Sequence, residues 1–180
     1  MFDSIFSDGD LRDFIRNNVI DPWEGTPLEG YVFMSPKQKG EFGERFVTKY
    51  MTILGNIVKR AKTSTAGHDR VINDILTEIK FSVSCRGNKN KKQVVKDKFV
   101  INHISKDKDW QRLIFCGINT KEEDIRVIWF TKEDFIQYLE TENCVFKYQQ
   151  GGKSIQNDDY ICTKVEDLLE LPFVKDISEW

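Results

Sequence analysis

The longest regular pattern of apolar and polar residues runs from Gln38 to about Asn56. Apolar side chains recur there at helical spacing and form one stripe, which predicts an amphipathic helix. The members of this stripe are Phe42, Phe46, Val47, Tyr50, Ile53 and Leu54. Gly55 then supplies a stop signal at the C-terminal end of the predicted helix.

A period of two residues replaces the helical period between residues 69 and 83. Asn73-Asp74 is a turn dipeptide between two alternating runs, which predicts a β-hairpin with a two-residue loop. That loop length places Ile72 opposite Ile75, Val71 opposite Leu76, and Asp69 opposite Glu78. Because strand side chains alternate, Lys80 shares the face of Glu78. The other face is apolar and carries Ile72, Ile75, Ile79, Phe81 and Val83.

Shorter patterns predict the remaining elements. Strands are expected at 57–61, 99–105, 113–118, 126–130, 145–148 and 160–162. Helices are expected after the caps at 7–10, after Thr131 with Asp134, and after Thr163 with Glu166. We expect the first of these helices to pack through Leu11, Phe14 and Ile15. Residues 21–37 are punctuated by proline and glycine and predict an irregular loop anchored by Trp23, Tyr31 and Phe33.

These elements predict an α/β or α+β domain with a central mixed sheet flanked by helices. The hairpin and the strands near 113–118 and 126–130 form the sheet, and helix 38–56 packs on it. We expect one domain over residues 1–180, with a core at about 38–130 and a C-terminal extension at 131–180 that is a candidate DNA-recognition element. The 180 residues are 39% hydrophobic, which is enough for a substantial core.

The composition bears on the cellular location of the protein and on its binding partners. The four cysteines form no CxxC pair, which indicates reduced thiols in a cytoplasmic protein. No apolar run approaches the roughly 20 residues of a membrane span, and the N-terminus lacks the pattern of a signal peptide. The net charge is -2, so a nucleic-acid-binding surface would have to arise from local clustering of basic residues.

The polar face of the hairpin carries the candidate chemistry. Two carboxylates opposite each other on paired strands repel unless a cation lies between them. Mg²⁺ suits that position, because it takes oxygen ligands and is usually held by one or two carboxylates while a phosphate completes its shell. Lys80 beside them is placed to orient a metal-bound water or to stabilise charge on phosphorus.

Asp69, an eight-residue gap and then Glu78-Ile79-Lys80 resemble the signature of the PD-(D/E)xK nuclease superfamily. His68 stands where the name of the superfamily places a proline. The resemblance covers about residues 38–120 and implies a restriction-endonuclease-like core. It implies that Asp69, Glu78 and the Ile79 carbonyl bind Mg²⁺ and that Lys80 is the catalytic lysine. It also implies a helix carboxylate, for which Glu44 and Glu41 compete, and Glu44 lies nearer the apolar stripe.

Three further segments are candidates for DNA contact. Residues 85–98 contain six basic side chains and one acid, and Arg86, Lys89, Lys91 and Lys92 would neutralise phosphates unless this is an ordinary surface loop. His103 either lines the site, touches DNA or is simply a packed or surface residue. The loop at 149–159 would reach base edges through Gln150 and Lys153 or is a plain hairpin loop. It is not a phosphate-binding Walker loop, because Lys147 replaces the first glycine.

The expected function is a Mg²⁺-dependent DNA endonuclease, specifically a type II restriction endonuclease that cuts a defined sequence in double-stranded DNA. A homodimer is expected, because cutting both strands of a palindromic site takes two copies of the active site. Two alternatives stay open. One is a structure-selective phage or repair nuclease or resolvase, and the other is a nucleic-acid-binding module without catalysis.

Overall fold

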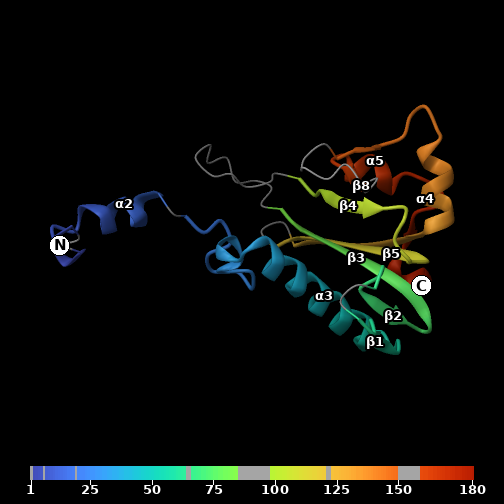
Figure 1. The fold of residues 1–180 in the computed structure, drawn as a ribbon, viewed down its shortest axis with the longest axis horizontal. Helices are drawn as coiled ribbons and strands as arrows, with labels where there is room; N and C mark the ends of the chain where they lie inside the picture. The colour runs from blue at the N-terminus through green and yellow to red at the C-terminus, as the bar shows by residue number, and fades with distance from the viewer. Residues whose placement is uncertain are drawn as a thin grey trace.

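A computed structural model describes residues 2–5, 7–18, 20–63, 66–84, 98–120, 123–149 and 159–180. Its centre is a mixed sheet with the strand order β1-β2-β3-β5-β6-β9, and a smaller sheet has the order β4-β8-β7 (Figure 1). The central strands are β1 (Val58–Arg60), β2 (Arg70–Ile72), β3 (Ile75–Val83), β5 (Arg112–Asn119), β6 (Asp124–Thr131) and β9 (Lys175–Asp176). The smaller sheet contains β4 (Ile101–Ser105), β7 (Phe146–Tyr148) and β8 (Asp159–Cys162). The predicted mixed sheet flanked by helices is confirmed.

The hairpin of β2 and β3 forms in the predicted register. Ile72 pairs with Ile75 and Val71 with Leu76. Asn73 and Asp74 adopt φ values of 50° and 65°, the left-handed conformation that a tight two-residue hairpin loop requires. Strand β2 begins at Arg70, so Asp69 lies one residue beyond the ladder, where its N–H donates to the Thr77 carbonyl at 3.0 Å.

Strands β3 and β5 run parallel, with Glu78 beside Leu113 and Lys80 beside Phe115. A parallel pair needs a long connection. Here the connection leaves the central sheet and forms β4, which Figure 1 shows above β3. The Val100 N–H donates to Ser82 Oγ at 3.1 Å and ties the start of β4 to the polar face of β3. Strand β4 thereby covers the face of β3 that carries Glu78 and Lys80.

Both faces of the central sheet are buried. Ile114, Cys116 and Trp129 belong to a cluster that packs under helix α3 (Pro36–Ile53) and the 21–34 loop. Leu113, Phe115 and Phe130 belong to a second cluster with the smaller sheet, α4 (Lys132–Leu139) and α5 (Val165–Leu169). Figure 1 shows α3 on one side of the sheet and β4, β8, α4 and α5 on the other.

Helix α3 is held by strong local signals. Ser35 and Gln38 form a capping box at its start, and Gly55 with φ 86° follows its end. The predicted apolar stripe is wrong at the C-terminal end, because Ile53 is 74% exposed and Leu54 is also exposed. Met51, absent from the predicted stripe, is fully buried instead. Val47 and Met51 belong to the core cluster between α3 and the sheet, so the face of the helix that carries them is buried and Ile53 lies outside it.

Helix α2 (Asp10–Asn18) forms after its predicted caps but does not pack as expected. None of its side chains is buried, and Phe14 is 65% exposed. Figure 1 shows α2 extending away from the sheets. The other short elements are α1 (Phe2–Ile5), the 3-10 turn η1 (Tyr31–Phe33) and the 3-10 turn η2 (Ile177–Glu179).

Two smaller expectations also need correction. Phe33 is exposed and does not anchor the 21–37 loop, whereas Trp23 and Tyr31 are buried. Helix α5 begins after Lys164 without a side-chain cap, so Thr163 is not its N-cap. Thr131 caps α4 as predicted, accepting from the Asp134 N–H at 3.1 Å. None of the helices among the described residues is both long and apolar enough to cross a membrane.

Candidate active site

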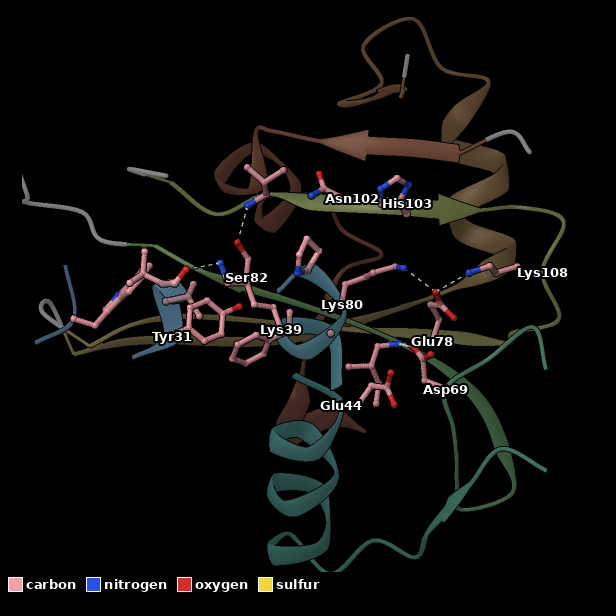
Figure 2. Close-up of a pocket in the computed structure, with 18 residues that line it drawn as sticks. Tyr31, Lys39, Glu44, Asp69, Glu78, Lys80, Ser82, Asn102, His103 and Lys108 are labelled. Carbon is pink, nitrogen blue, oxygen red and sulfur yellow. Dashed lines mark hydrogen bonds and ion pairs between the residues drawn. The ribbon is translucent and has the colours of Figure 1, made fainter. Parts of the chain in front are cut away.

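A cavity of about 600 Å³ lies between α3, β3 and β4, and we call it the carboxylate cavity. Three carboxylates line it, Glu44, Asp69 and Glu78, together with three ammonium groups, Lys39, Lys80 and Lys108. Asn102 and His103 line it from β4, and Tyr31 lines it from η1 (Figure 2). The structure thus brings together six predicted site residues from α3, the entrance to β2, β3 and β4, namely Glu44, Asp69, Glu78, Ile79, Lys80 and His103.

Glu78 and Lys80 face the cavity because alternation along β3 puts both on the same side. Glu78 is 3% exposed, and its Oε1 accepts a hydrogen bond from Lys80 Nζ at 2.7 Å. Lys108 Nζ lies 3.6 Å from the same oxygen. Two ammonium groups therefore offset the cost of burying this carboxylate.

Asp69 lies beside this pair at the entrance to β2. Its Oδ2 accepts from the Ile79 N–H at 2.7 Å, which fixes the carboxylate against the middle of β3. Burial first, and then the negative charges of Glu78 and Glu44, raise the pKa of Asp69 to about 6. The surroundings of Asp69 therefore disfavour the charged form of its carboxyl group.

Glu44 reaches the cavity from α3 and pairs with Arg70, whose Nη1 donates to Glu44 Oε2 at 2.8 Å. The same nitrogen donates to the Asp69 carbonyl at 2.7 Å, and Arg70 Nε donates to Thr48 Oγ1 at 2.9 Å. Arg70 thus ties α3 to the chain that carries Asp69. Glu41 is exposed and does not line the cavity, so Glu44 is the helix carboxylate that the structure brings to the site.

The donor set suits a hard divalent cation. In the part of the chain that the structure describes, no three His, Cys, Asp or Glu side chains form a ready-made group of metal ligands. Mg²⁺ does not need such a group, because it is usually held by one or two carboxylates, waters and a substrate phosphate. A cation next to Asp69 would relieve the repulsion that raises the pKa of this residue. Ile79, whose carbonyl is the third predicted ligand, also lines the cavity.

His103 lines the cavity from an irregular part of β4. The pairing of β4 with β8 shifts register between Ile101 and Ile104, and His103 has φ 53°. Gln149 Oε1 accepts from the His103 N–H at 3.0 Å, and Asp159 Oδ2 lies 3.2 Å from His103 Nδ1. These contacts hold a left-handed residue at a bulge, which is a feature that often re-aims side chains near functional sites.

The other predicted DNA contacts cannot be placed. Arg86, Lys89, Lys91, Lys92, Gln150 and Lys153 lie outside the described residues. Trp23, a predicted anchor of the 21–37 loop, is 4% exposed, and its Nε1 donates to the Ser84 carbonyl at 3.3 Å. Its role is therefore structural.

Sequence reasoning missed Lys39, Arg70 and Lys108. The sequence does contain a pattern that indicates the role of Arg70. Strand alternation from Ile72 puts Arg70 on the core face, where a buried cation needs an acidic partner. No such pattern indicates the role of Lys108, since it lies 30 positions after Glu78 and only the path of the chain through β4 brings the two together.

Comparisons with known proteins add little to this geometry. No protein-family model matches the chain, and no curated protein matches it. Among solved structures, a bacterial homing endonuclease, I-Ssp6803I, matches with a TM-score of 0.40 and 15% sequence identity. The match covers 67% of this chain and 86% of that chain. The function therefore has to be inferred from the carboxylate cavity itself.

Proposed function

We propose that this protein is a Mg²⁺-dependent DNA endonuclease of the PD-(D/E)xK type. The observation that carries the proposal is the convergence of Asp69, Glu78 and Lys80 in one cavity, with the pKa of Asp69 raised to about 6. Carboxyl groups held close together in a cavity at a cost in stability are typical of sites selected for function. A lysine in contact with one of them matches phosphodiester chemistry.

Asp69, Glu78 and the Ile79 carbonyl would hold the ion. When bound, Mg²⁺ lowers the pKa of a coordinated water and stabilises negative charge on the scissile phosphate. The cavity lining offers oxygen donors of the hard type that Mg²⁺ prefers.

The side chains of the chain itself have separate tasks. Glu78 Oε1 holds the Lys80 ammonium at 2.7 Å and aims it into the cavity, where it orients the attacking water and stabilises charge on the phosphoryl oxygens. The water oxygen bonds to phosphorus in line with the P–O bond that breaks. The attacking water releases a proton to solvent, and the departing oxygen takes up a proton from solvent. Glu44 acts through Arg70, which holds the Asp69 backbone by its carbonyl at 2.7 Å. A Glu44 change therefore alters the position of Asp69.

The proposed substrate is double-stranded DNA, cut at a defined sequence as by a type II restriction endonuclease. This finer assignment rests on the resemblance of the Asp69 and Glu78-Ile79-Lys80 motif. Two copies of the chain, arranged as a symmetric homodimer, would place one cavity on each strand of a palindromic site. His103 at the rim of the cavity is the described residue that we assign to DNA contact.

The test incubates the purified protein with plasmid and phage DNA, with Mg²⁺ or with a chelator, beside Lys80→Ala. We expect discrete Mg²⁺-dependent fragments and a loss of about 10²- to 10⁴-fold in cleavage rate in the variant. Lys59→Ala is the matched control, because Lys59 is an exposed lysine that pairs with Asp74 on the outer hairpin. This control should cut like the wild type.

Branched and linear substrates are compared in the same experiment. Cleavage of branched DNA alone would replace the restriction assignment with a structure-selective nuclease or resolvase. DNA binding without Mg²⁺-dependent cleavage, unchanged by Lys80→Ala, would contradict the catalytic proposal and leave a binding module.

A further inference from the structure

The carboxylate cavity extends beyond its catalytic end. Figure 2 shows Lys80 between two groups of side chains, with Glu78 and Lys108 on one side and Lys39 and Tyr31 on the other. The proposed chemistry uses only the first group. Lys39 lines the same cavity from the first turns of α3 and has no role in the chemistry proposed above.

Lys39 differs from the other two cavity lysines in its contacts. Lys80 and Lys108 both contact Glu78 Oε1, at 2.7 and 3.6 Å. Lys39 forms no ion pair with a carboxylate of the described residues. Its Nζ lies 5.2 Å from the centre of the Tyr31 ring and 3.5 Å from the Val32 carbonyl, a long and weak contact. Among the three cavity lysines, Lys39 is thus the one whose positive charge is not paired with a carboxylate of the described residues.

Tyr31 makes a rigid support for this ammonium. The ring is buried and packs edge-on against Trp23 and Phe42, with centroid distances of 5.5 and 5.7 Å. A cation over such a ring is held by attraction to the aromatic face. Because the side chain is already partly ordered, less conformational entropy is lost when it binds an anion.

The helix start does not supply a competing anion site. Ser35 Oγ accepts the Gln38 N–H at 3.3 Å, and the Lys39 N–H donates to the Ser35 carbonyl at 2.9 Å. These amides are therefore used within the helix. At this end of α3, the donor that lines the cavity is the Lys39 side chain.

We propose that Lys39 binds a second phosphate of the DNA strand that is cut, and so positions that strand over Asp69, Glu78 and Lys80. This inference rests on the proposed function. Lys39 and Lys80 line the same cavity from different elements, α3 and β3. A strand whose scissile phosphate lies at Lys80 therefore passes Lys39 with one of its neighbouring phosphates.

The main test measures DNA affinity against salt concentration, with Ca²⁺ replacing Mg²⁺ and again in a chelator. We expect Lys39→Ala to weaken binding about tenfold, as for the loss of one hydrogen bond to a charged group. The slope of log K against log salt should fall by about 1, the value for one lost phosphate contact. Lys39→Arg should keep both the affinity and the slope.

Lys37→Ala is the matched control. Lys37 lies on the same helix but is exposed and does not line the cavity. It should leave affinity and slope within error of the wild type. Equal losses in Lys37→Ala and Lys39→Ala would contradict a specific contact. Thermal melting of each variant verifies that the fold is intact.

Two further measurements separate positioning from a structural role. In Mg²⁺, Lys39→Ala should raise KM while kcat changes by less than about threefold, as when binding is lost equally in the ground and transition states. A neutral methylphosphonate placed at successive positions near the mapped cut should weaken wild-type binding at one position beside the scissile phosphate. Lys39→Ala should be insensitive to that substitution.

The two proposals fail in different ways. A wild type that cuts DNA, with Lys39→Ala unchanged in affinity, salt slope and KM, would overturn the inference and leave the nuclease. A wild type that neither binds nor cuts any DNA would overturn the proposed function, and the role of Lys39 with it.

Discussion

At the scale of single residues, Asp69 shows most clearly that the site is built at the expense of stability. Its carboxyl group is buried next to Glu78 and within the field of Glu44, and its pKa rises from 3.8 to about 6. The folded state therefore binds a proton at Asp69 more tightly than the unfolded state does. Stability from the protonated form is full below about pH 4 and is lost as the pH rises through 6.

We predict that Asp69→Asn is more stable than the wild type at pH 7.5 in a chelator, by on the order of 2 to 3 kcal/mol. The asparagine stays neutral and keeps an oxygen that can accept the Ile79 N–H. At pH 4 the difference should nearly vanish, because both side chains are then uncharged. Urea unfolding between pH 4 and pH 8 measures it, and an Asn variant that is less stable at pH 7.5 would contradict the electrostatic account.

The local sequence already identifies Asp69, Glu78 and Lys80, because a two-residue turn and strand alternation fix their relative positions. Arg70 and Lys108 are different. Their contacts with Glu44 and Glu78 join residues far apart in the sequence. Neither contact follows from the period of a strand, since each depends on how a second element packs.

At the scale of elements, the close approach of α3 to β3 brings Glu44 to the cavity. Gly43 makes this approach possible, because a Cβ atom at this position would lie 2.3 Å from the Phe81 Cβ. Phe81 belongs to the strand that carries Glu78 and Lys80. The glycine is thus required by contact between the two elements, and its φ is ordinary for a helix.

We predict that Gly43→Ala destabilises the protein by about 1 to 3 kcal/mol, because the helix must move away from β3. Gly40→Ala is the control on the same helix. A Cβ there meets nothing within 4 Å, so alanine should stabilise the protein by up to about 1 kcal/mol through its higher helix propensity. Chemical denaturation of the two variants tests this, and equal effects would show that the close contact is not limiting.

Helices α2 and α3 show where periodicity misleads. Both form close to where the sequence patterns predict them, because caps, stop signals and helical periodicity act within a few residues. The stripe of α2 remains exposed, and that of α3 loses contact with the sheet at Ile53. An apolar stripe indicates which face of a helix prefers burial. That face is buried only where a second element packs against it.

At the scale of the whole molecule, the central sheet is covered on both sides. Neighbouring residues of β5 point into different clusters, Ile114 toward α3 and Leu113 toward the smaller sheet. Both side chains are fully buried. A sheet with one solvated face would bury only every second residue.

We predict that Leu113→Ala and Ile114→Ala each cost about 2 to 5 kcal/mol of unfolding free energy, because each leaves a cavity in a packed cluster. Ile125→Ala on the neighbouring strand is the control. Ile125 is exposed, so its change should stay within about 0.5 kcal/mol. Guanidinium unfolding compares the three variants, and a tolerated change at either buried position would mean that one cluster contributes little.

The sequence by itself determined the hairpin, its register, the end of α3 and the close placement of Asp69, Glu78 and Lys80. These features depend on turn chemistry, caps and alternation, which act between residues close in the chain. Only the tertiary structure decided that β4 lies over β3, that Arg70 holds Glu44, and that Lys39 and Lys108 line the same cavity. Those contacts join segments distant in sequence, and their energies come from packing and charge pairing, which no local pattern of residues encodes.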